Sequence, residues 1–244
     1  MASAPRGTAL VTGGARRIGR SLVRACASAG YDVAIHVRAL DADAEAAADE
    51  VRAAGRAATI QVCDLGKESQ VSGLIPACEA ALGPLTLLVN SASLFEDDSL
   101  ATMSRASWDA HLEVNLRAPL VLAQVFARQL PAGRNGLIIN LLDQRVLNPT
   151  ADFFSYSLSK QALWSATKML AQALAPNIRV NAIGPGPVLA SIHQSAADFA
   201  AEAQSTLLQR PVDPTEIAQA MLYLIDAVSV TGQMIAVDGG QHLT

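Results

Sequence analysis

A regular alternation of short apolar runs with longer helical stretches constrains the fold of this sequence more than any other feature. Seven short runs are rich in β-branched and apolar residues and end at turn residues, at 8–12, 32–37, 58–62, 85–89, 137–141, 178–183 and 233–237. Such runs are typical of strands buried on both faces. Stretches with helical spacing lie between them, at 17–29, 43–54, 67–82, 105–129, 155–175 and 214–226. The alternation predicts βαβ units, and right-handed crossovers between them give an α/β fold with a doubly wound parallel sheet of about seven strands.

The length of the chain and the absence of linkers predict a single domain. The 244 residues fit one α/β core, and no repeat or segment rich in Pro, Gly or Ser divides them. We therefore expect residues 1–244 to form one domain that binds its ligand outside the carboxyl ends of the strands. The segment 187–210 follows a Gly-Pro-Gly turn. It is either a movable cover over this site or an ordinary surface helix preceded by a loop.

Charge and hydropathy exclude several classes of partner. The net charge of −4 leaves no basic stripe to neutralise the phosphates of a duplex, so we expect a small-molecule substrate and no nucleic acid. No apolar run approaches the roughly 20 residues that span a bilayer, so we expect no membrane contact.

Histidine and cysteine usage argues against a metal site and against disulfides. Histidines occur without metal-binding spacing, at 36, 111, 193 and 242, so we predict no metal. The three cysteines, Cys26, Cys63 and Cys78, are odd in number and lie in apolar surroundings. This usage favours reduced thiols and a cytoplasmic protein.

A glycine-rich turn joins the first predicted strand to the first predicted helix, at Thr12–Gly19. Glycines let backbone N–H groups approach a pyrophosphate, and the N-terminus of the following helix favours its negative charge. The position of the turn between strand and helix therefore predicts a dinucleotide cofactor.

The end of the second predicted strand indicates which dinucleotide binds. This strand ends Ile35-His36-Val37-Arg38, without the carboxylate that would accept ribose hydroxyls in an NAD site. The guanidinium of Arg38, helped by Arg16, suits a 2′-phosphate and favours NADP. The alternative is that both arginines are solvated at the surface, and Asp41 lies nearby, past the expected strand end.

Two polar residues follow the next strands, at the edge where a dinucleotide would cross. We expect Asp64 to contact the adenine and Asn90 to pack against the cofactor, although either could cap a helix or turn.

Tyr156 and Lys160 are four residues apart on a predicted helix, so they share one face. A cation beside a phenol stabilises the phenolate and lowers the tyrosine pKa, which suits a proton donor in hydride transfer. Asn115 follows a helical run and either holds a water that links Lys160 to solvent or is a helix-kink residue.

These motifs run in order from the first strand to the last, and the chain resembles the short-chain dehydrogenase/reductase family in them. They are TGGARRIG at 12–19, CDL at 63–65, NSAS at 90–93, VNL at 114–116, YSLSK at 156–160, RVNAIGPG at 179–186 and TGQMIAVDGG at 231–240. The resemblance implies a Rossmann-like fold, Tyr156 as the acid, Lys160 as its partner and ribose ligand, and Asn115 as the water-relay residue. It also implies a homotetramer built through the helix at 155–175 and the C-terminal strand region. We expect NADPH to contact Gly13, Arg16, Arg17, Ile18, Gly19, His36, Arg38, Asp64, Leu65, Asn90, Ser91, Ala92, Tyr156, Lys160, Pro185 and Gly186.

Two departures from the common family pattern resemble the pteridine reductases. Arg17 replaces the middle glycine of the phosphate loop, and Asp143 replaces the usual catalytic serine thirteen residues before the tyrosine. In pteridine reductases the loop arginine touches cofactor phosphate and substrate, and an aspartate works beside the tyrosine. Ser93 and Phe95 fall where those enzymes place a ligand-binding serine and an aromatic that stacks on the pterin, although Phe95 could simply be core.

The chemistry of Asp143 supports this subclass. A carboxylate would repel the alkoxide that develops when a ketone is reduced, whereas it can accept from the N–H donors of a pterin or, when protonated, help to supply a proton. The hypothesis is an NADPH-dependent reductase of a dihydropterin or related pteridine, including dihydrofolate or dihydromonapterin, with Arg17, Ser93, Phe95, Asp143 and Tyr156 on the substrate. The alternatives are a short-chain reductase of another carbonyl or imine, in which Asp143 serves only structure, and a non-catalytic NADP(H)-binding sensor.

Overall fold

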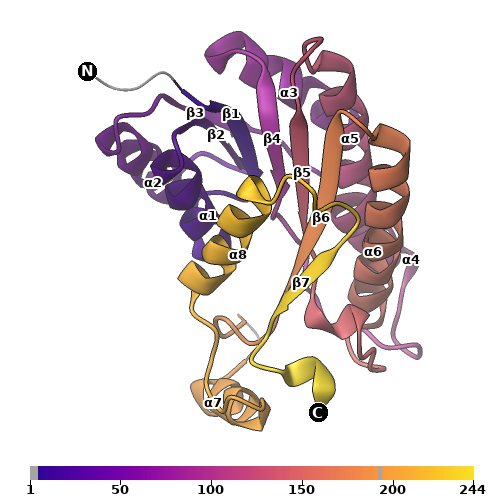
Figure 1. Ribbon diagram of the computed structural model, residues 1–244. Coiled ribbons are helices and arrows are strands. Elements are labelled where there is room, and N and C mark those ends of the chain that lie inside the picture. Colours follow the sequence, from indigo (N-terminus) through magenta and orange to yellow (C-terminus); the bar gives the residue numbers. More distant parts are fainter. Residues whose placement is uncertain (1–4, 192–193) are drawn as a thin grey trace.

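The computed structural model describes residues 5–191 and 194–244. His193 and part of the expected cover at 187–210 lie outside the described residues. The strands are β1 (Gly7–Thr12), β2 (Tyr31–Val37), β3 (Ala58–Val62), β4 (Leu85–Asn90), β5 (Gly136–Leu141), β6 (Ile178–Pro185) and β7 (Met234–Val237). They form one parallel sheet in the order β3-β2-β1-β4-β5-β6-β7 (Figure 1). The predicted doubly wound α/β fold is confirmed.

The helices cover both faces of the sheet and bury two apolar layers. They are α1 (Arg17–Ser28), α2 (Ala42–Ala53), α3 (Glu68–Leu82), α4 (Arg105–Leu112), α5 (Ala118–Gln129), α6 (Phe154–Leu174), α7 (Ala196–Ser205) and α8 (Pro214–Asp226). One layer packs α1, α2 and α8 against the sheet, and the other packs α3, α5 and α6 (Figure 1). The central strands β4 and β5 are buried throughout, which explains their unbroken apolar sequences.

The helical stretch predicted at 105–129 is not one regular helix. A π-helical turn, η1 (Glu113–Arg117), separates α4 from α5. Pro119 stands in the first turn of α5. Because proline has no N–H, the carbonyl four residues earlier, that of Asn115, has no regular helical donor. The proline therefore accounts for the irregularity at Asn115.

Three short elements surround the carboxyl ends of the strands. The helix α7 lies within 187–210, where a surface helix was one of the two alternatives, and the sequence did not predict the two 3₁₀ turns, η2 (Gln144–Val146) and η3 (Gln241–Leu243). At the same edge, the Thr12 hydroxyl accepts hydrogen bonds from the backbone N–H groups of Ser91 and Ala92, at 2.9 and 3.0 Å. This contact joins the ends of β1 and β4 at the switch point of the strand order, where α/β sheets bind ligands.

Among the described residues, no helix has the length and apolar character needed to cross a membrane. The same part of the chain holds no group of three or more side chains arranged as metal ligands.

Candidate active site

A cavity of about 610 Å³ opens at the carboxyl ends of the strands. It reaches from the glycine-rich turn, past the ends of β4, β5 and β6, to α7 and the C-terminal turn η3. The sequence-predicted site residues that it brings together are Gly13, Arg16, Arg17, Ile18, Gly19, Ser91, Ala92, Ser93, Phe95, Asp143, Tyr156, Lys160, Pro185 and Gly186. The predicted residues that do not line it are His36, Arg38, Asp64, Leu65, Asn90 and Asn115.

The glycine-rich turn is packed too closely for side chains at two positions. A Cβ on Gly19 would lie 2.0 Å from the carbonyl oxygen of Gly13, and one on Gly13, whose φ is +65°, would lie 3.0 Å from the Cα of Ala92. Arg16 occupies the N-cap of α1 without a side-chain hydrogen bond to the helix, and the first turn carries no acidic residue. The turn therefore fits a pyrophosphate on the first N–H groups of α1.

His36 holds the glycine-rich turn in place through two hydrogen bonds of its ring. Its Nδ1 accepts from the Gly13 N–H at 3.2 Å, so its Nε2 carries the proton donated to the carbonyl of Cys63 at 2.9 Å. Burial lowers the pKa of His36, which favours the neutral ring that both bonds require. The structure gives His36 a supporting position, and direct contact with a cofactor stays a prediction.

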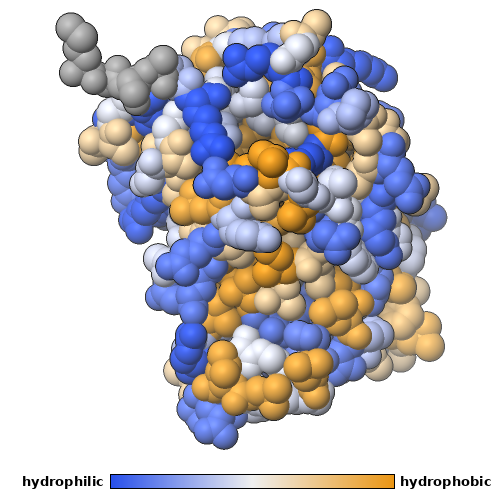
Figure 2. Space-filling model, in the orientation of Figure 1, coloured by the Kyte–Doolittle hydropathy of each residue, from blue (hydrophilic) through white to orange (hydrophobic). Residues whose placement is uncertain are grey.

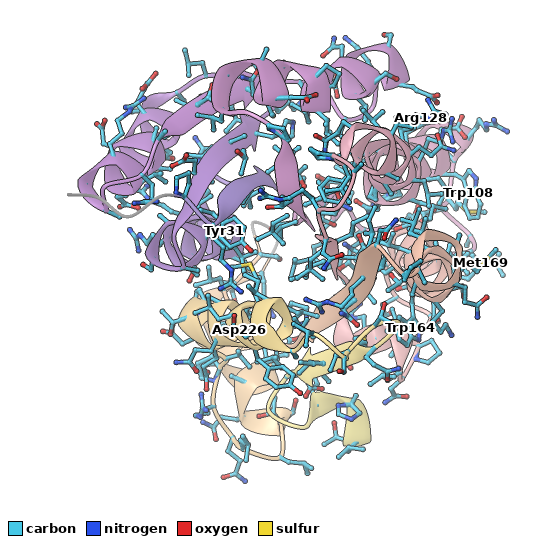
Figure 3. The ribbon with its side chains drawn as sticks, turned by 45° about the horizontal axis from the view of Figure 1, so that its top comes forward. Tyr31, Trp108, Arg128, Trp164, Met169 and Asp226 are labelled. Atoms are coloured by element: carbon cyan, nitrogen blue, oxygen red, sulfur yellow. The ribbon has the colours of Figure 1, made fainter. Side chains whose placement is uncertain are left out.

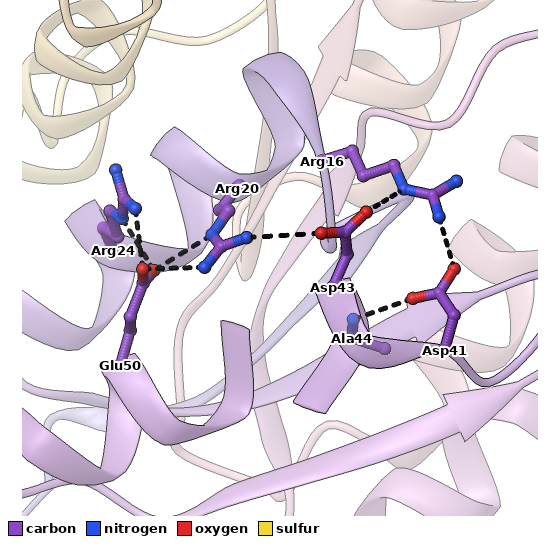
Figure 4. A network of polar contacts seen from close by, with 7 residues as sticks. All are labelled: Arg16, Arg20, Arg24, Asp41, Asp43, Ala44 and Glu50. Carbon is purple, nitrogen blue, oxygen red and sulfur yellow. Dashed lines mark hydrogen bonds and ion pairs between the residues drawn. The ribbon is translucent and has the colours of Figure 1, made fainter. Parts of the chain in front are cut away.

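The two arginines expected at a 2′-phosphate differ in their surroundings. Arg38 is exposed and lies outside the cavity. Arg16 lines the cavity but pairs with Asp41, at 2.6 Å, and with Asp43 (Figure 4). Asp41 also accepts from the Ala44 N–H at 2.9 Å and caps α2. The residue past the strand end is therefore both a helix cap and a competitor for the Arg16 guanidinium.

The polar residues after β3 and β4 belong to local turns and to the core. Asp64 accepts from the Gly66 N–H at 3.1 Å, as expected of a turn cap. Asn90 is buried and donates to Asn140 at 2.8 Å, and Asn140 donates to Thr167 at 2.9 Å. Leu65 is also buried. The Asp64 contact matches the capping alternative, whereas the Asn90 contact is a side-chain bond within the core. The cofactor contacts expected of these residues remain predictions.

Tyr156 and Lys160 lie one turn apart on α6 and share a face, as expected. The Tyr156 hydroxyl donates to Oδ2 of Asp143 at 2.8 Å. The Lys160 Nζ donates to the carbonyl of Leu141 at 2.8 Å and lies 5.7 Å from the centre of the Tyr156 ring. All three ionisable groups line the same cavity.

The pKa of Tyr156 beside Asp143 and Lys160 shifts in the direction opposite to the one expected from the sequence. Burial, together with the Asp143 carboxylate, raises the pKa of Tyr156 well above its ordinary value, and Arg145 opposes this increase. Burial lowers the pKa of Lys160 to about 8, although Asp143 opposes that change. The predicted lowering of the Tyr156 pKa by Lys160 is therefore wrong for this arrangement, because the phenol faces a carboxylate rather than the ammonium group.

Asn115 joins two parts of the site. Its Nδ2 donates to the carbonyl of Leu94 at 2.9 Å and to Ser159 at 3.0 Å, while its Oδ1 accepts from the Leu94 N–H at 2.8 Å and from Ser93 at 3.2 Å. It lies in the π-helical turn η1, in agreement with the kink alternative. Its role in a water relay stays a prediction.

An aromatic wall that the sequence only partly predicted lines the cavity. Phe95 stacks on Phe153, with ring centres 4.3 Å apart, and meets Tyr156 edge-on at 4.7 Å. Phe153, the N-cap residue of α6, lies in the left-handed region, with φ +50°, a conformation that costs a non-glycine residue of the order of 1 kcal/mol. One face of Phe95 is therefore covered by protein, and the Phe153-Phe154 pair at the start of α6 was the signal that could have indicated this wall.

Asp143 has a structural contact as well as the contact with Tyr156. Its Oδ1 accepts from the Arg145 N–H at 2.9 Å and caps the turn η2. Gln144 and Arg145 of this turn line the cavity, and the Arg145 guanidinium lies 5.0 Å from the centre of the Phe153 ring. Sequence reasoning missed both residues, because their approach to the cavity depends on this turn.

Arg17 connects the glycine-rich turn to the segment after β6. Its backbone has φ +51°, where a glycine would be relaxed, and its guanidinium donates to the carbonyls of Leu189 and Ala190, each at 2.9 Å. The described part of 187–210 contributes further residues to the cavity that sequence reasoning missed, among them Gln194, Phe199 and Glu202. Glu202 accepts from Gln194 at 2.8 Å and from Gln241 at 3.1 Å.

The chain is similar in sequence and in structure to known reductases. Residues 13–242 match the sequence profile of the family described as enoyl-(acyl carrier protein) reductase. The FolM alternative dihydrofolate reductase 1 from Brucella suis, solved in complex with NADP, superposes with a TM-score of 0.94 and is 46% identical, over 100% of this chain and 96% of that chain. The FolM protein from Brucella canis, also with NADP, gives 0.92 and 44%, over 98% and 95%. The 3-oxoacyl-(acyl-carrier-protein) reductase FabG of Staphylococcus aureus is 32% identical over 97% of this chain and 98% of its own length.

Proposed function

The chain belongs to the short-chain dehydrogenase/reductase family, and from this premise we propose that it is an NADPH-dependent reductase of dihydropterins or related pteridines. The observation that carries the proposal is the 2.8 Å contact between the Tyr156 hydroxyl and the Asp143 carboxylate, inside a cavity with an aromatic wall. A carboxylate at this place opposes the negative charge of ketone reduction but suits a ring that carries N–H donors. Similarity to the two FolM proteins supports the same substrate class.

The cofactor is NADP(H), with which both FolM structures were solved. The glycine-rich turn fits its pyrophosphate, as the close approach of Gly13 and Gly19 indicates. We assign its 2′-phosphate to Arg16 and Arg38. Because Asp41 and Asp43 already hold the Arg16 guanidinium, a bound phosphate must compete with these carboxylates. The exposed Arg38 supplies a second positive charge.

Bound NADPH supplies the hydride to the carbon of a C=N bond. The ring nitrogen that then becomes strongly basic takes its proton from Tyr156, whose raised pKa keeps the phenol protonated until that moment. Asp143 orients the phenol and accepts from a ring N–H. We assign Lys160 to the cofactor ribose and to compensation of the phenolate charge, since it is the cation on the same face of α6.

The segment 187–210 is proposed to cover this site. Arg17 spans the cavity to its first residues, at Leu189 and Ala190, and Glu202 of α7 holds the C-terminal turn through Gln241. A non-glycine residue kept at φ +51° supports a functional reason for Arg17, which we place on both cofactor phosphate and substrate. We place Ser93 and Phe95 on the substrate.

A homotetramer and a cytoplasmic location complete the proposal. The strand β7 forms an edge of the sheet, and Figure 2 shows hydrophobic side chains along the middle of this face of the molecule. On α6, Met169 is 68% exposed and lies on the outer side with Trp164 (Figure 3). Exposed apolar surface of this kind is typical of subunit interfaces. The cysteines are all free and buried, which fits a reducing compartment.

A reductase of another carbonyl or imine is the second candidate, because the FabG relative is named as a 3-oxoacyl-(acyl-carrier-protein) reductase and so acts on a carbonyl. A further alternative, a non-catalytic NADP(H) sensor, would bind the cofactor without turnover.

The test is NADPH oxidation with dihydrobiopterin, dihydromonapterin, dihydrofolate and a simple ketone. We expect turnover with a dihydropterin and a loss of roughly a hundredfold or more in Tyr156→Phe, with NADPH binding retained. Turnover of the ketone alone would contradict the pteridine assignment.

A further inference from the structure

We propose that Asp98 is a positioning residue for the reductase reaction, because it clamps the segment after β4 to the start of the catalytic helix α6. This segment, residues 91–99, has no regular secondary structure, and its Ser93 and Phe95 line the cavity. The inference rests on the proposed function, in which Tyr156 of α6 donates the proton, and it deepens that function: the clamp holds Tyr156 and the aromatic wall where turnover requires them.

The helix α6 has no side-chain cap of its own. An N-cap residue normally supplies an oxygen to the first N–H groups of a helix, but the N-cap of α6 is Phe153, which lies at φ +50°. Asp98 supplies the oxygens instead. Its carbonyl accepts from the Phe154 N–H at 3.0 Å, and its Oδ1 accepts from the Ser155 N–H at 2.8 Å, across 57 residues of sequence. Tyr156 follows directly, so the two N–H groups before the catalytic residue are both bound to Asp98.

The Asp98 side chain is itself held in place. The residue is 5% exposed, and its second carboxylate oxygen, Oδ2, accepts from the Ser107 hydroxyl of α4 at 2.9 Å. The Nε2 of His111, also on α4, accepts from the Glu96 N–H at 3.2 Å, two residues before Asp98. A buried carboxylate with both oxygens bonded has little freedom to turn, because each lost bond would leave a polar group without a partner. Asp98 therefore joins α4, the segment 91–99 and α6.

A shift of this clamp would reach the reacting groups. Phe95, three residues before Asp98, stacks on Phe153 with ring centres 4.3 Å apart and meets Tyr156 edge-on at 4.7 Å. The Tyr156 hydroxyl also lies 2.8 Å from the Asp143 carboxylate. Without the bonds from Asp98, the first turn of α6 can move relative to the segment 91–99. A misplacement of about 1 Å in a reacting group can lower a rate by roughly a hundredfold.

The experiment measures kcat with dihydrobiopterin per NADPH-binding site, so that unfolded chains are not counted. Asp98→Ala removes both carboxylate bonds and should lower kcat by about tenfold to a hundredfold, while the Kd for NADPH stays nearly unchanged. Asp98→Asn should restore most of kcat, because its oxygen can accept from the Ser155 N–H and its amide can donate to the Ser107 hydroxyl. Asp98→Glu keeps the charge but moves the oxygens by one methylene, so its kcat should lie below that of Asp98→Asn.

The matched control is Asp213→Ala, which removes the side-chain cap of another helix. Asp213 lies outside the cavity and accepts from the Thr215 N–H at 2.8 Å at the start of α8. Loss of a cap destabilises a protein, so the thermal midpoint should fall in this variant while kcat stays unchanged.

An unchanged kcat in Asp98→Ala, with a thermal midpoint lowered as in Asp213→Ala, would overturn the proposal, since a purely structural cap predicts that result. Equal losses in Asp98→Ala and Asp98→Asn would also overturn it, because charge rather than position would then matter. If Asp98→Ala does not fold, Asp98→Glu decides against Asp98→Asn, and equal kcat in these two variants overturns the clamp. Failure of the proposed function is distinct. The unaltered enzyme would then not reduce dihydrobiopterin, and the same variants are compared with the simple ketone, since Tyr156 donates the proton to either substrate; turnover of neither would remove both proposals.

Discussion

Asp143→Asn is the substitution that tests the chemistry of the site most directly, because it removes a charge at nearly constant shape. In the unaltered protein Oδ2 accepts from Tyr156 at 2.8 Å and Oδ1 accepts from the Arg145 N–H at 2.9 Å. An asparagine oxygen can still cap η2, so the turn should persist. The variant therefore isolates the charge that faces the phenol.

The size of the loss separates two roles for the carboxylate. Exchange of a charged for a neutral hydrogen bond costs about 1–1.5 kcal/mol, or roughly tenfold in rate, if Asp143 only orients Tyr156. Participation in proton transfer contributes roughly 10²–10⁴-fold. We expect a loss of about a hundredfold or more in kcat with a dihydropterin. The pKa of Tyr156 should also fall in this variant, because the Asp143 carboxylate helps to raise it.

The assay is kcat/KM from NADPH oxidation, with one dihydropterin and one simple ketone, for the unaltered enzyme, Asp143→Asn and Asp143→Ser. Serine restores a neutral donor, so this variant should shift specificity toward the ketone. NADPH affinity and the thermal midpoint serve as controls for folding. An asparagine variant that kept its dihydropterin turnover within about threefold would refute the role of the charge, and a serine variant without any shift toward the ketone would refute the specificity argument.

Three further predictions follow from the same geometry. Arg38→Ala should raise the Kd for NADPH by about tenfold or more and leave that for NADH unchanged, in fluorescence titrations; equal affinities of the unaltered protein for both cofactors would exclude a phosphate contact. Phe95→Ala should weaken pteridine binding far more than NADPH binding, since Phe153 already covers one ring face and the ligand needs the other; unchanged titrations would make Phe95 a packing residue. Lys160 has a pKa lowered to about 8 by burial, against about 10.4 when unfolded, so the folded chain loses this proton first. The free energy of unfolding should therefore rise between about pH 8 and about pH 10.4, and Lys160→Met should abolish that rise in urea titrations; the same slope in both proteins would refute the shift.

Local sequence patterns determined the strands, the order of the elements and half of the residues that line the cavity. Each of the seven strands lies where an apolar run predicted it. The five inner strands are buried on both faces almost throughout, which demands such a run, whereas the edge strands β3 and β7 are only partly buried. The positions of Tyr156, Lys160 and Asp143 in one cavity also follow from the sequence, since residues after parallel strands meet at one edge of the sheet.

Tertiary structure alone decided what these residues contact and how they ionise. The pairing of Arg16 with Asp41 and Asp43 joins the start of α1 to that of α2, and the stacking of Phe95 on Phe153 joins residues that are distant in sequence. The raised pKa of Tyr156 arises from burial and from the Asp143 carboxylate, although the helical spacing suggested the influence of Lys160. Spacing places two residues on one face, but the direction of a side chain and its exposure to water depend on every element packed around it, and these determine the charge it carries.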